Sequence, residues 1–236
     1  MAQRIKKSGK YMKSDFSNTL ILVPVYNCEK HLDELFTCIN KVSKDIHVLC
    51  INDGSNDNSL NIIKRNRISY IDLGSNRGKG YALKVGFLHA KRKGYKYIIT
   101  LDGDMQHDPL YIPNFIQAQN LFEANLVIGF RDFSFKNMPF SRVLSNYITS
   151  SIVSYKSDIK VLDSQSGYRL YDLDFFNVKE IKTTRYQMET EILLNYIKKG
   201  AKIFHTEIPV IYKDEKSNIS HFRDITNFVK VILSPL

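Results

Sequence analysis

The chain has 236 residues, of which 43% are hydrophobic and 25% charged, and its formal net charge is +10. This length and composition indicate one globular domain, or one domain with a C-terminal subdomain, with a substantial core. The positive charge favours an anionic partner such as a nucleotide, a nucleic acid or an acidic membrane surface. Cys28, Cys38 and Cys50 have no metal-ligand spacing, so we expect reduced core thiols in a cytoplasmic protein.

Residues 1–18 are rich in lysine and arginine, and their few apolar residues have no regular period. We predict a flexible basic arm. A signal peptide is not expected, because the following apolar run, 20–25, is short and contains Pro24. No stretch approaches the ~18 apolar residues of a membrane-spanning helix. Any membrane association is therefore expected to be peripheral or to involve a membrane-anchoring subunit.

Residues 20–25 form the first predicted strand, and one apolar stripe predicts a helix from about 30 to 43. The second predicted strand, 46–51, ends in the polar sequence Asn52-Asp53-Gly54-Ser55. Its side chains either bind a ribose or base, or simply cap the next helix. Taken alone, the motif favours the simple capped loop.

A glycine-rich loop, 74–80, follows the third predicted strand, 68–73, and carries Lys79 at a helix start. Backbone N–H groups and the helix dipole make such a loop an anion site. The loop is not the phosphate loop of nucleoside triphosphatases, which has a longer glycine spacing and a Ser or Thr after the lysine.

The central feature of the sequence is the strand 97–101, which runs directly into Asp102-Gly103-Asp104-Met105-Gln106-His107. Carboxylate and amide oxygens at a strand end suit Mg²⁺ or Mn²⁺. These cations are usually held by one or two carboxylates plus substrate phosphates, which implies a diphosphate ligand. The alternative is a surface Asp-Gly turn, but the preceding buried strand favours a functional site.

A predicted helix, 111–124, and a strand, 126–130, ending at Arg131 continue the alternation of strands and helices. This order is typical of βαβ units, so we predict an α/β fold with a mostly parallel sheet. An amphipathic helix over 139–155 either packs in the core or faces a membrane or acceptor. The remaining predicted elements are a strand or loop at 164–171, a helix at 188–199, an extended segment at 203–212 and a final helix with apolar residues between 222 and 232.

Five short motifs occur in a fixed order along the chain: 23–27 (VPVYN), 52–55 (NDGS), 76–80 (NRGKG), 102–107 (DGDMQH) and 166–169 (SGYR). Together they resemble family 2 glycosyltransferases, most closely the dolichol-phosphate or polyprenyl-phosphate mannose or glucose synthase group. The resemblance implies the GT-A fold, with a Rossmann-like, mostly parallel sheet and helices on both faces. It implies one catalytic domain over 19–233, with a nucleotide-sugar half at 19–132 and an acceptor half at 133–233.

The resemblance also implies roles for individual residues. The residues expected to bind the nucleotide sugar are Pro24, Tyr26, Asn27, Asp53, Lys79, Asp102, Gly103, Arg131 and Arg223. The residues expected to bind the metal are Asp102, Asp104 and Gln106. Catalytic roles are expected for Asp104, Arg131 and Arg142. Contacts with the acceptor are expected for Arg142, Ser145 and Arg169. Cys28 departs from the glutamate common at its position. Gly103 and His107 are closer to users of UDP-sugars than to users of GDP-mannose.

The implied reaction is inverting transfer from a nucleotide-diphosphate sugar, with UDP slightly favoured over GDP, to a polyprenyl phosphate (dolichyl or undecaprenyl phosphate). The implied location is the cytoplasmic face of a membrane, with the enzyme bound peripherally to the anionic surface. A phosphate acceptor needs no general base, whereas a hydroxyl acceptor does.

Two alternatives stay open. Glu189 and Glu191 are two residues apart and cannot share a helical face, so at most one reaches the cleft; a sugar-hydroxyl acceptor therefore remains the second hypothesis. A module that only binds nucleotide sugar would lack the metal carboxylates, which are present. The basic residues are scattered without an aromatic platform, so no nucleic-acid partner is expected.

Overall fold

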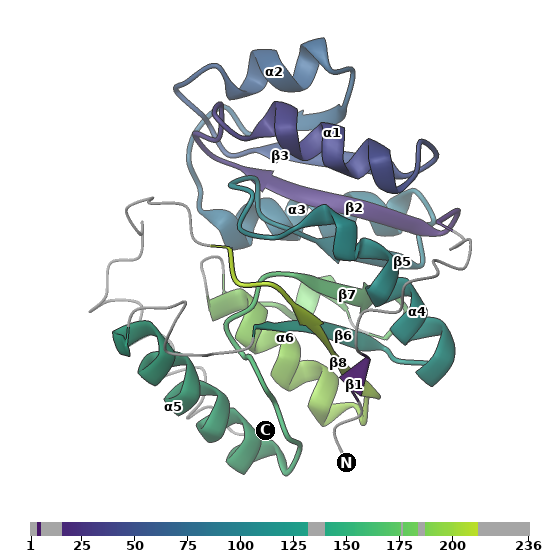
Figure 1. The fold of residues 1–236 in the computed structure, drawn as a ribbon, viewed down its shortest axis with the longest axis vertical. Coiled ribbons are helices and arrows are strands. Elements are labelled where there is room, and N and C mark those ends of the chain that lie inside the picture. Colours follow the sequence, from purple (N-terminus) through teal and green to yellow (C-terminus); the bar gives the residue numbers. More distant parts are fainter. Residues whose placement is uncertain (1–3, 6–15, 132–139, 176, 184–186, 212–236) are drawn as a thin grey trace.

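The computed structural model describes residues 4–5, 16–131, 140–175, 177–183 and 187–211. Its centre is a sheet in which the described strands lie in the order β1-β8-β6-β7-β5-β2-β3-β4 (Figure 1). The strands are β1 (Arg4–Ile5), β2 (Thr19–Val25), β3 (His47–Asn52), β4 (Ser69–Asp72), β5 (Tyr97–Thr100), β6 (Leu126–Arg131), β7 (Arg169–Asp172) and β8 (Ile203–Ile208).

All neighbouring strands are parallel except β7, which is antiparallel to both β5 and β6. The predicted mostly parallel α/β sheet is therefore confirmed. In the register of β5 and β7, Thr100 lies opposite Arg169. Because β7 runs the other way, its first residue and the loop before it lie at the carboxyl ends of β5 and β6.

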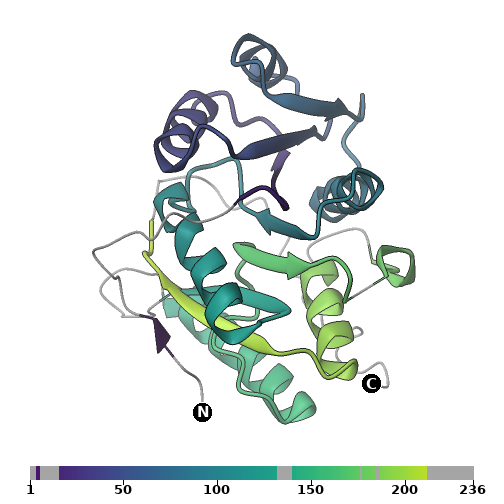
Figure 2. The same cartoon turned by 90° about the vertical axis from the view of Figure 1, so that its right-hand side faces the viewer.

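Helices cover both faces of the sheet (Figure 2). They are α1 (Leu32–Val42), α2 (Ser59–Arg65), α3 (Lys79–Arg92), α4 (Ile112–Phe122), α5 (Phe140–Ser157) and α6 (Gln187–Lys198), with short 3₁₀ turns η1 (Pro109–Tyr111) and η2 (Val178–Glu180). Ile21 and Val23 of β2 face the core beneath α1 and α4, whereas Leu20 and Leu22 face the core beneath α3 and α6. This alternation follows from the two-residue period of a strand, and it explains why β2 is apolar throughout.

The N-terminal segment only partly matches the predicted flexible arm. Arg4–Ile5 form β1, which pairs with β8, and Phe16 is buried with 8% exposure. Pairing of a short strand depends on backbone groups, so it leaves no side-chain pattern to read in the sequence. Residues 1–3 and 6–15 lie outside the described residues, and the arm as a whole stays a prediction.

The predicted final helix, which includes Arg223, also lies outside the described residues. None of the helices that the structure describes is both long and apolar enough to cross a membrane. The division of the chain into nucleotide-sugar and acceptor halves is not tested by the single continuous sheet and stays a prediction.

Candidate active site

The predicted site residues before α5 gather at one edge of the sheet, where β2, β3, β5 and β6 have their carboxyl ends. Ligands of open α/β sheets bind at this edge. The N-terminal ends of α3 and α6 bring Lys79 and Glu189 to the same place, as the contacts of Lys79 with Asp102 and Glu189 show.

Asp102, Lys79 and Glu189 form a compact charged cluster. The Lys79 ammonium lies 2.7 Å from Asp102 Oδ1 and 3.2 Å from Glu189 Oε1, and its side chain is 19% exposed. Burial disfavours the charged ammonium, but the two carboxylates outweigh it, so the pKa of Lys79 is raised. Burial raises the pKa of Asp102, yet Lys79 and Arg131 bring it below its usual value. Both side chains are therefore ionised at neutral pH.

Gly167 lies against this cluster without a side chain. A Cβ at that position would lie 2.8 Å from Lys79 Nζ, 2.9 Å from Glu189 Oε1 and 3.3 Å from Asp102 Oδ2. The Ser-Gly-Tyr-Arg motif therefore leaves the space in which the three charged groups meet.

The turn after Asp102 is held by its own polar groups. Asp104 Oδ1 accepts the Gln106 N–H at 3.0 Å, and Met105 has a left-handed backbone with φ of 61°. His107 Nδ1 accepts the Asp102 N–H at 3.0 Å. Burial lowers the pKa of His107 to about 4, so the imidazole is neutral at neutral pH and can act as this acceptor.

The donor set fits a hard divalent cation. Asp102, Asp104 and Gln106 supply two carboxylates and an amide oxygen within one short turn. Over the described ranges, no group of three or more His, Cys, Asp and Glu side chains is placed to hold a metal. Mg²⁺ and Mn²⁺ are commonly held by one or two carboxylates together with substrate phosphates. Metal binding by these three residues stays a prediction.

Loops after β2 and β3 form the neighbouring part of the edge. Asn27 Oδ1 accepts the Asn56 N–H at 2.8 Å, and Ser55 Oγ accepts the Asn27 N–H at 3.1 Å. Asp53 accepts the N–H groups of Arg77 and Gly78 at 2.7 and 2.9 Å. Asp53 therefore fixes the glycine-rich loop beside the strand ends, a contact that the sequence did not reveal.

Tyr26, with 38% exposure, directly follows β2, and the half-buried Pro24 lies near the carboxyl end of that strand. Cys28 packs against the Asp-Gly-Asp turn, because a Cβ at Gly103 would lie 3.1 Å from Cys28 Sγ. Burial, and then the charge of Asp104, raise the pKa of Cys28 to about 12, so it is a neutral thiol. The nucleotide contacts predicted for these residues stay predictions.

Arg131, at the end of β6, is held in a fixed orientation by Asp163. Its Nε and Nη2 donate to Asp163 Oδ2 and Oδ1 at 2.8 and 3.1 Å. Asp163 is fully buried and also accepts from Asn146 Nδ2 of α5 at 2.8 Å. Burial raises the pKa of Asp163, but the Arg131 charge and hydrogen bonds lower it below its usual value. No motif in the sequence singled out Asp163.

The predicted acceptor contact of Arg169 needs correction. Arg169 is fully buried, and its guanidinium donates to the carbonyls of Ser166, Glu189 and Ser164, each at 2.7 Å. A side chain with no exposed surface and three carbonyl partners supports the loop before β7 and the start of α6. We therefore assign Arg169 to holding Gly167 and Glu189 in place.

The two glutamates of α6 point to different surroundings, as their spacing predicted. Glu189 is 6% exposed and lies at Lys79. Glu191 accepts the N–H groups of Lys182 and Thr183 at 2.9 and 2.8 Å and so fixes the chain before α6. The side chains of Arg142 and Ser145 lie outside the described part of α5, and their predicted roles are untested.

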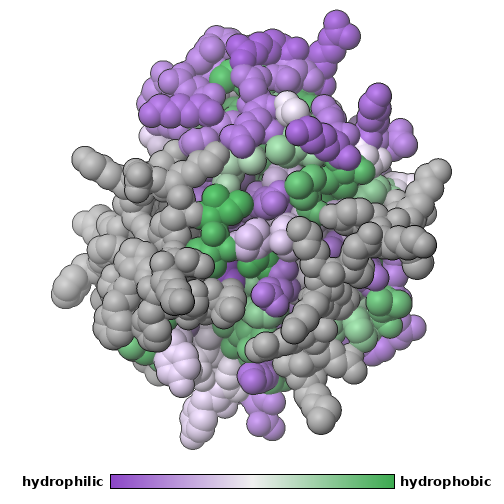
Figure 3. Space-filling model, viewed as in Figure 1, coloured by the Kyte–Doolittle hydropathy of each residue, from purple (hydrophilic) through white to green (hydrophobic). Residues whose placement is uncertain are grey.

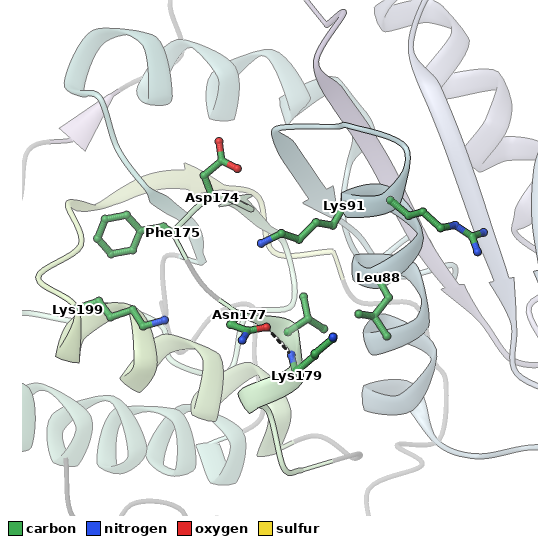
Figure 4. A pocket seen from close by; sticks show the side chains of 9 residues that line it. Leu88, Lys91, Asp174, Phe175, Asn177, Lys179 and Lys199 are labelled. Carbon is green, nitrogen blue, oxygen red and sulfur yellow. Dashed lines mark hydrogen bonds between the residues drawn. The ribbon is translucent and has the colours of Figure 1, made fainter.

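A separate cleft of about 580 Å³ lies between the C-terminal turns of α3 and α6 (Figure 4). Lys79 begins α3 and Arg92 ends it, so this cleft is ~20 Å from the Asp102 cluster. Lys91 Nζ donates to the Leu173 carbonyl at 3.3 Å, and Lys199 pairs with Glu180 at 3.2 Å. These cations complement helix C-termini, and we do not assign the cleft to substrate.

Comparison with solved structures identifies the class of fold. The chain superposes on glucosyl-3-phosphoglycerate synthase from Mycobacterium tuberculosis, solved with Mn²⁺, UDP and glucosyl-3-phosphoglycerate, with a TM-score of 0.73. The match covers 92% of this chain and 78% of that chain at 15% identity. The protein therefore has the GT-A glycosyltransferase fold, as its motifs implied.

Sequence comparison identifies the family. Residues 20–180 match the profile of Glycosyl transferase family 2, so the chain belongs to this family and is a glycosyltransferase. An uncharacterised protein of Methanocaldococcus jannaschii is 31% identical over 91% of this chain and 97% of its own length.

Two relatives carry names that state an activity. The UDP-N-acetylglucosamine–dolichyl-phosphate N-acetylglucosaminyltransferase of Methanococcus voltae is 27% identical over 82% of this chain and 86% of its own length. The polyprenol monophosphomannose synthase of Mycolicibacterium smegmatis is 22% identical over 86% of this chain and 80% of its own length.

Proposed function

We propose that this protein transfers a sugar from a nucleotide-diphosphate sugar to a polyprenyl phosphate, with inversion, at the cytoplasmic face of a membrane. The names of the two relatives support a polyprenyl-phosphate acceptor. UDP is the first nucleotide to test, since one relative is named for a UDP-sugar and the matched structure contains UDP.

The observation that carries the proposal is the pairing of Glu189 with Lys79. Glu189 is the carboxylate of α6 that reaches the site, and the Lys79 ammonium lies 3.2 Å from its Oε1. A general base must have an oxygen available to the acceptor proton. The ion pair with Lys79 engages one of the two Glu189 oxygens. A phosphate acceptor is already ionised near neutral pH and needs no base at this position.

The charges of the site have a clear use in such a reaction. Donor diphosphate and acceptor phosphate are both anions, and the site must hold them close together. Asp102, Asp104 and Gln106 would hold Mg²⁺ or Mn²⁺, which supplies charge neutralisation for the leaving diphosphate. Arg131, fixed by Asp163, presents a guanidinium at the end of β6, where its planar fork suits phosphate oxygens.

The test compares acceptors and variants together. Arg142→Ala should weaken use of a short polyprenyl phosphate far more than donor binding, while Glu189→Gln and Glu191→Gln leave the chemical step largely intact. Glu191→Gln is the matched control, because Glu191 lies on the same helix and contacts the chain before it. If Glu189→Gln abolishes transfer while Arg142→Ala has no effect, a hydroxyl acceptor with Glu189 as base is the better assignment.

A further inference from the structure

Helix α5 carries a cluster of exposed apolar side chains. Of the ten exposed large hydrophobic residues that the structure describes, five lie on this helix: Leu144 (44%), Tyr147 (71%), Ile148 (46%), Ile152 (40%) and Tyr155 (93%). Residues 144, 148 and 152 recur every four residues, and 147 and 155 each lie three residues after one of them, which places all five on one face of a helix. We call these five residues the α5 stripe. The other five exposed hydrophobic residues are spread over separate elements, where single exposed apolar side chains are ordinary.

The opposite face of α5 packs on the domain. Val143, Asn146, Ser150 and Val153 are buried. Ser150 Oγ donates to Asn146 Oδ1 at 2.9 Å and accepts the Ser164 N–H at 2.9 Å. The helix is therefore anchored, and it presents the stripe outward. In both ribbon views α5 and α2 lie at opposite ends of the molecule (Figures 1 and 2). The surface at the α2 end is hydrophilic (Figure 3).

The charge of the helix suits an anionic bilayer. Residues 140–157 include Arg142 and Lys156 and contain no aspartate or glutamate, and the whole chain has a net charge of +10. Tyrosines, which supply two of the five stripe residues, have an apolar ring and a polar tip and are enriched where membranes meet water. An 18-residue helix is ~27 Å long, enough to lie along a membrane surface.

We propose that the α5 stripe docks the protein on an anionic lipid bilayer. The placement also has a consequence for the site, because Asn146, on the buried face of the same helix, holds Asp163, which holds Arg131. Helix α5 would therefore lie between a bilayer on the stripe and the Arg131 side of the site. The docking itself does not depend on the proposed function. Only its purpose does, which is to bring a lipid-borne phosphate to the Arg131 side of the site.

The test measures binding of the full chain to vesicles by co-sedimentation. The variant Tyr147→Ser/Ile148→Ser/Tyr155→Ser should bind vesicles containing phosphatidylglycerol at least about tenfold more weakly than the parent, since three apolar side chains no longer enter the interface. The control Leu110→Ser/Leu121→Ser removes exposed side chains of 44% and 62% exposure from η1 and α4 and should bind like the parent. Thermal unfolding and donor-sugar hydrolysis without lipid verify that both variants are folded.

Three results would overturn the docking inference. The triple variant could bind as tightly as the parent, or the control could lose binding equally. Light scattering could also show a parent dimer that the triple variant loses, which would assign the stripe to a second copy of the chain. The proposed function fails separately: if the stripe is needed for vesicle binding but detergent-dispersed polyprenyl phosphate is not glycosylated, docking stands and the acceptor assignment falls.

Discussion

Gly167→Ala is expected to disable the site and leave the fold intact. The added Cβ would lie 2.8 Å from Lys79 Nζ and 2.9 Å from Glu189 Oε1, whereas ordinary contact begins at 3.4 Å. Each charged group must therefore move by at least about half an ångström. The displaced Lys79 pairs with Asp102, a predicted metal ligand. Misplacement of such groups by ~1 Å can cost ~10²-fold in rate, so we expect a loss of roughly one to two orders of magnitude.

The stability cost of this change should be small. Both displaced atoms are the ends of long side chains, and the backbone of Gly167 is not among the left-handed glycines. Replacing glycine by alanine also restricts the unfolded chain, which stabilises by ~0.4–1 kcal/mol and offsets part of the crowding. The free energy of unfolding should stay within about 1 kcal/mol of the parent value.

Gly86→Ala is the matched control. Gly86 lies on α3, the helix that begins with Lys79, but its Cβ would meet the buried side chain of Leu22 in β2. Overpacking there should cost ~1–3 kcal/mol and leave the charged cluster unchanged. Metal-dependent UDP-sugar turnover below both melting temperatures, together with thermal unfolding, separates the two variants. Gly167→Ala turnover within about twofold of the parent, a change of only ~0.4 kcal/mol, would refute this reasoning, as would a melting temperature as low as that of Gly86→Ala.

Three further predictions address the metal, the buried arginine and pH. Asp104→Asn should keep the fold and lose ~10²–10³ in rate, because the diphosphate charge is no longer compensated; full parent activity in excess EDTA would contradict a metal role. Arg169→Met should lower the free energy of unfolding by about 3 kcal/mol or more in urea titrations, because three buried carbonyls lose their donor; a loss below ~1 kcal/mol would show that the site relaxes. His205 is buried, which lowers its pKa from 6.5 to about 4, and its Nε2 accepts the Leu162 N–H at 3.3 Å. Between these pH values the unfolded chain binds a proton at His205 that the folded chain does not bind. The free energy of unfolding therefore decreases by up to ~3 kcal/mol as the pH falls from 6.5 to about 4. His205→Gln should flatten this decline in unfolding measurements, and an unchanged slope would assign it to other groups.

The strand ends could be predicted from the sequence because each follows a short buried apolar run. The run 97–100 ends at Asp102 and the run 47–52 ends at Asp53, so their side chains had to meet at one edge of a parallel sheet. The amphipathic period of α5 was equally readable. These predictions depend on local patterns, in which the residues that decide the structure are neighbours in the chain.

The long-range contacts could not be read in this way. Gly167 meets Lys79 and Glu189 because β7 is antiparallel and begins at the edge where β5 ends, and nothing in the residues 169–172 marks the direction of that strand. Asp163 lies in a polar stretch that resembles an exposed loop, yet it is fully buried. Arg169 was expected at the acceptor from the family resemblance, whereas its partners are three backbone carbonyls, which have no signature in sequence.

The most direct test of the proposed acceptor is a transfer reaction with purified protein, Mn²⁺ or Mg²⁺, a panel of UDP- and GDP-sugars and a short polyprenyl phosphate. Mass spectrometry of the lipid and release of free nucleoside diphosphate are measured in the same sample. We predict one sugar added to the lipid phosphate for each nucleoside diphosphate released, with both signals lost in EDTA. Metal-dependent transfer to a sugar hydroxyl, with the polyprenyl phosphate unchanged, would contradict the proposed acceptor.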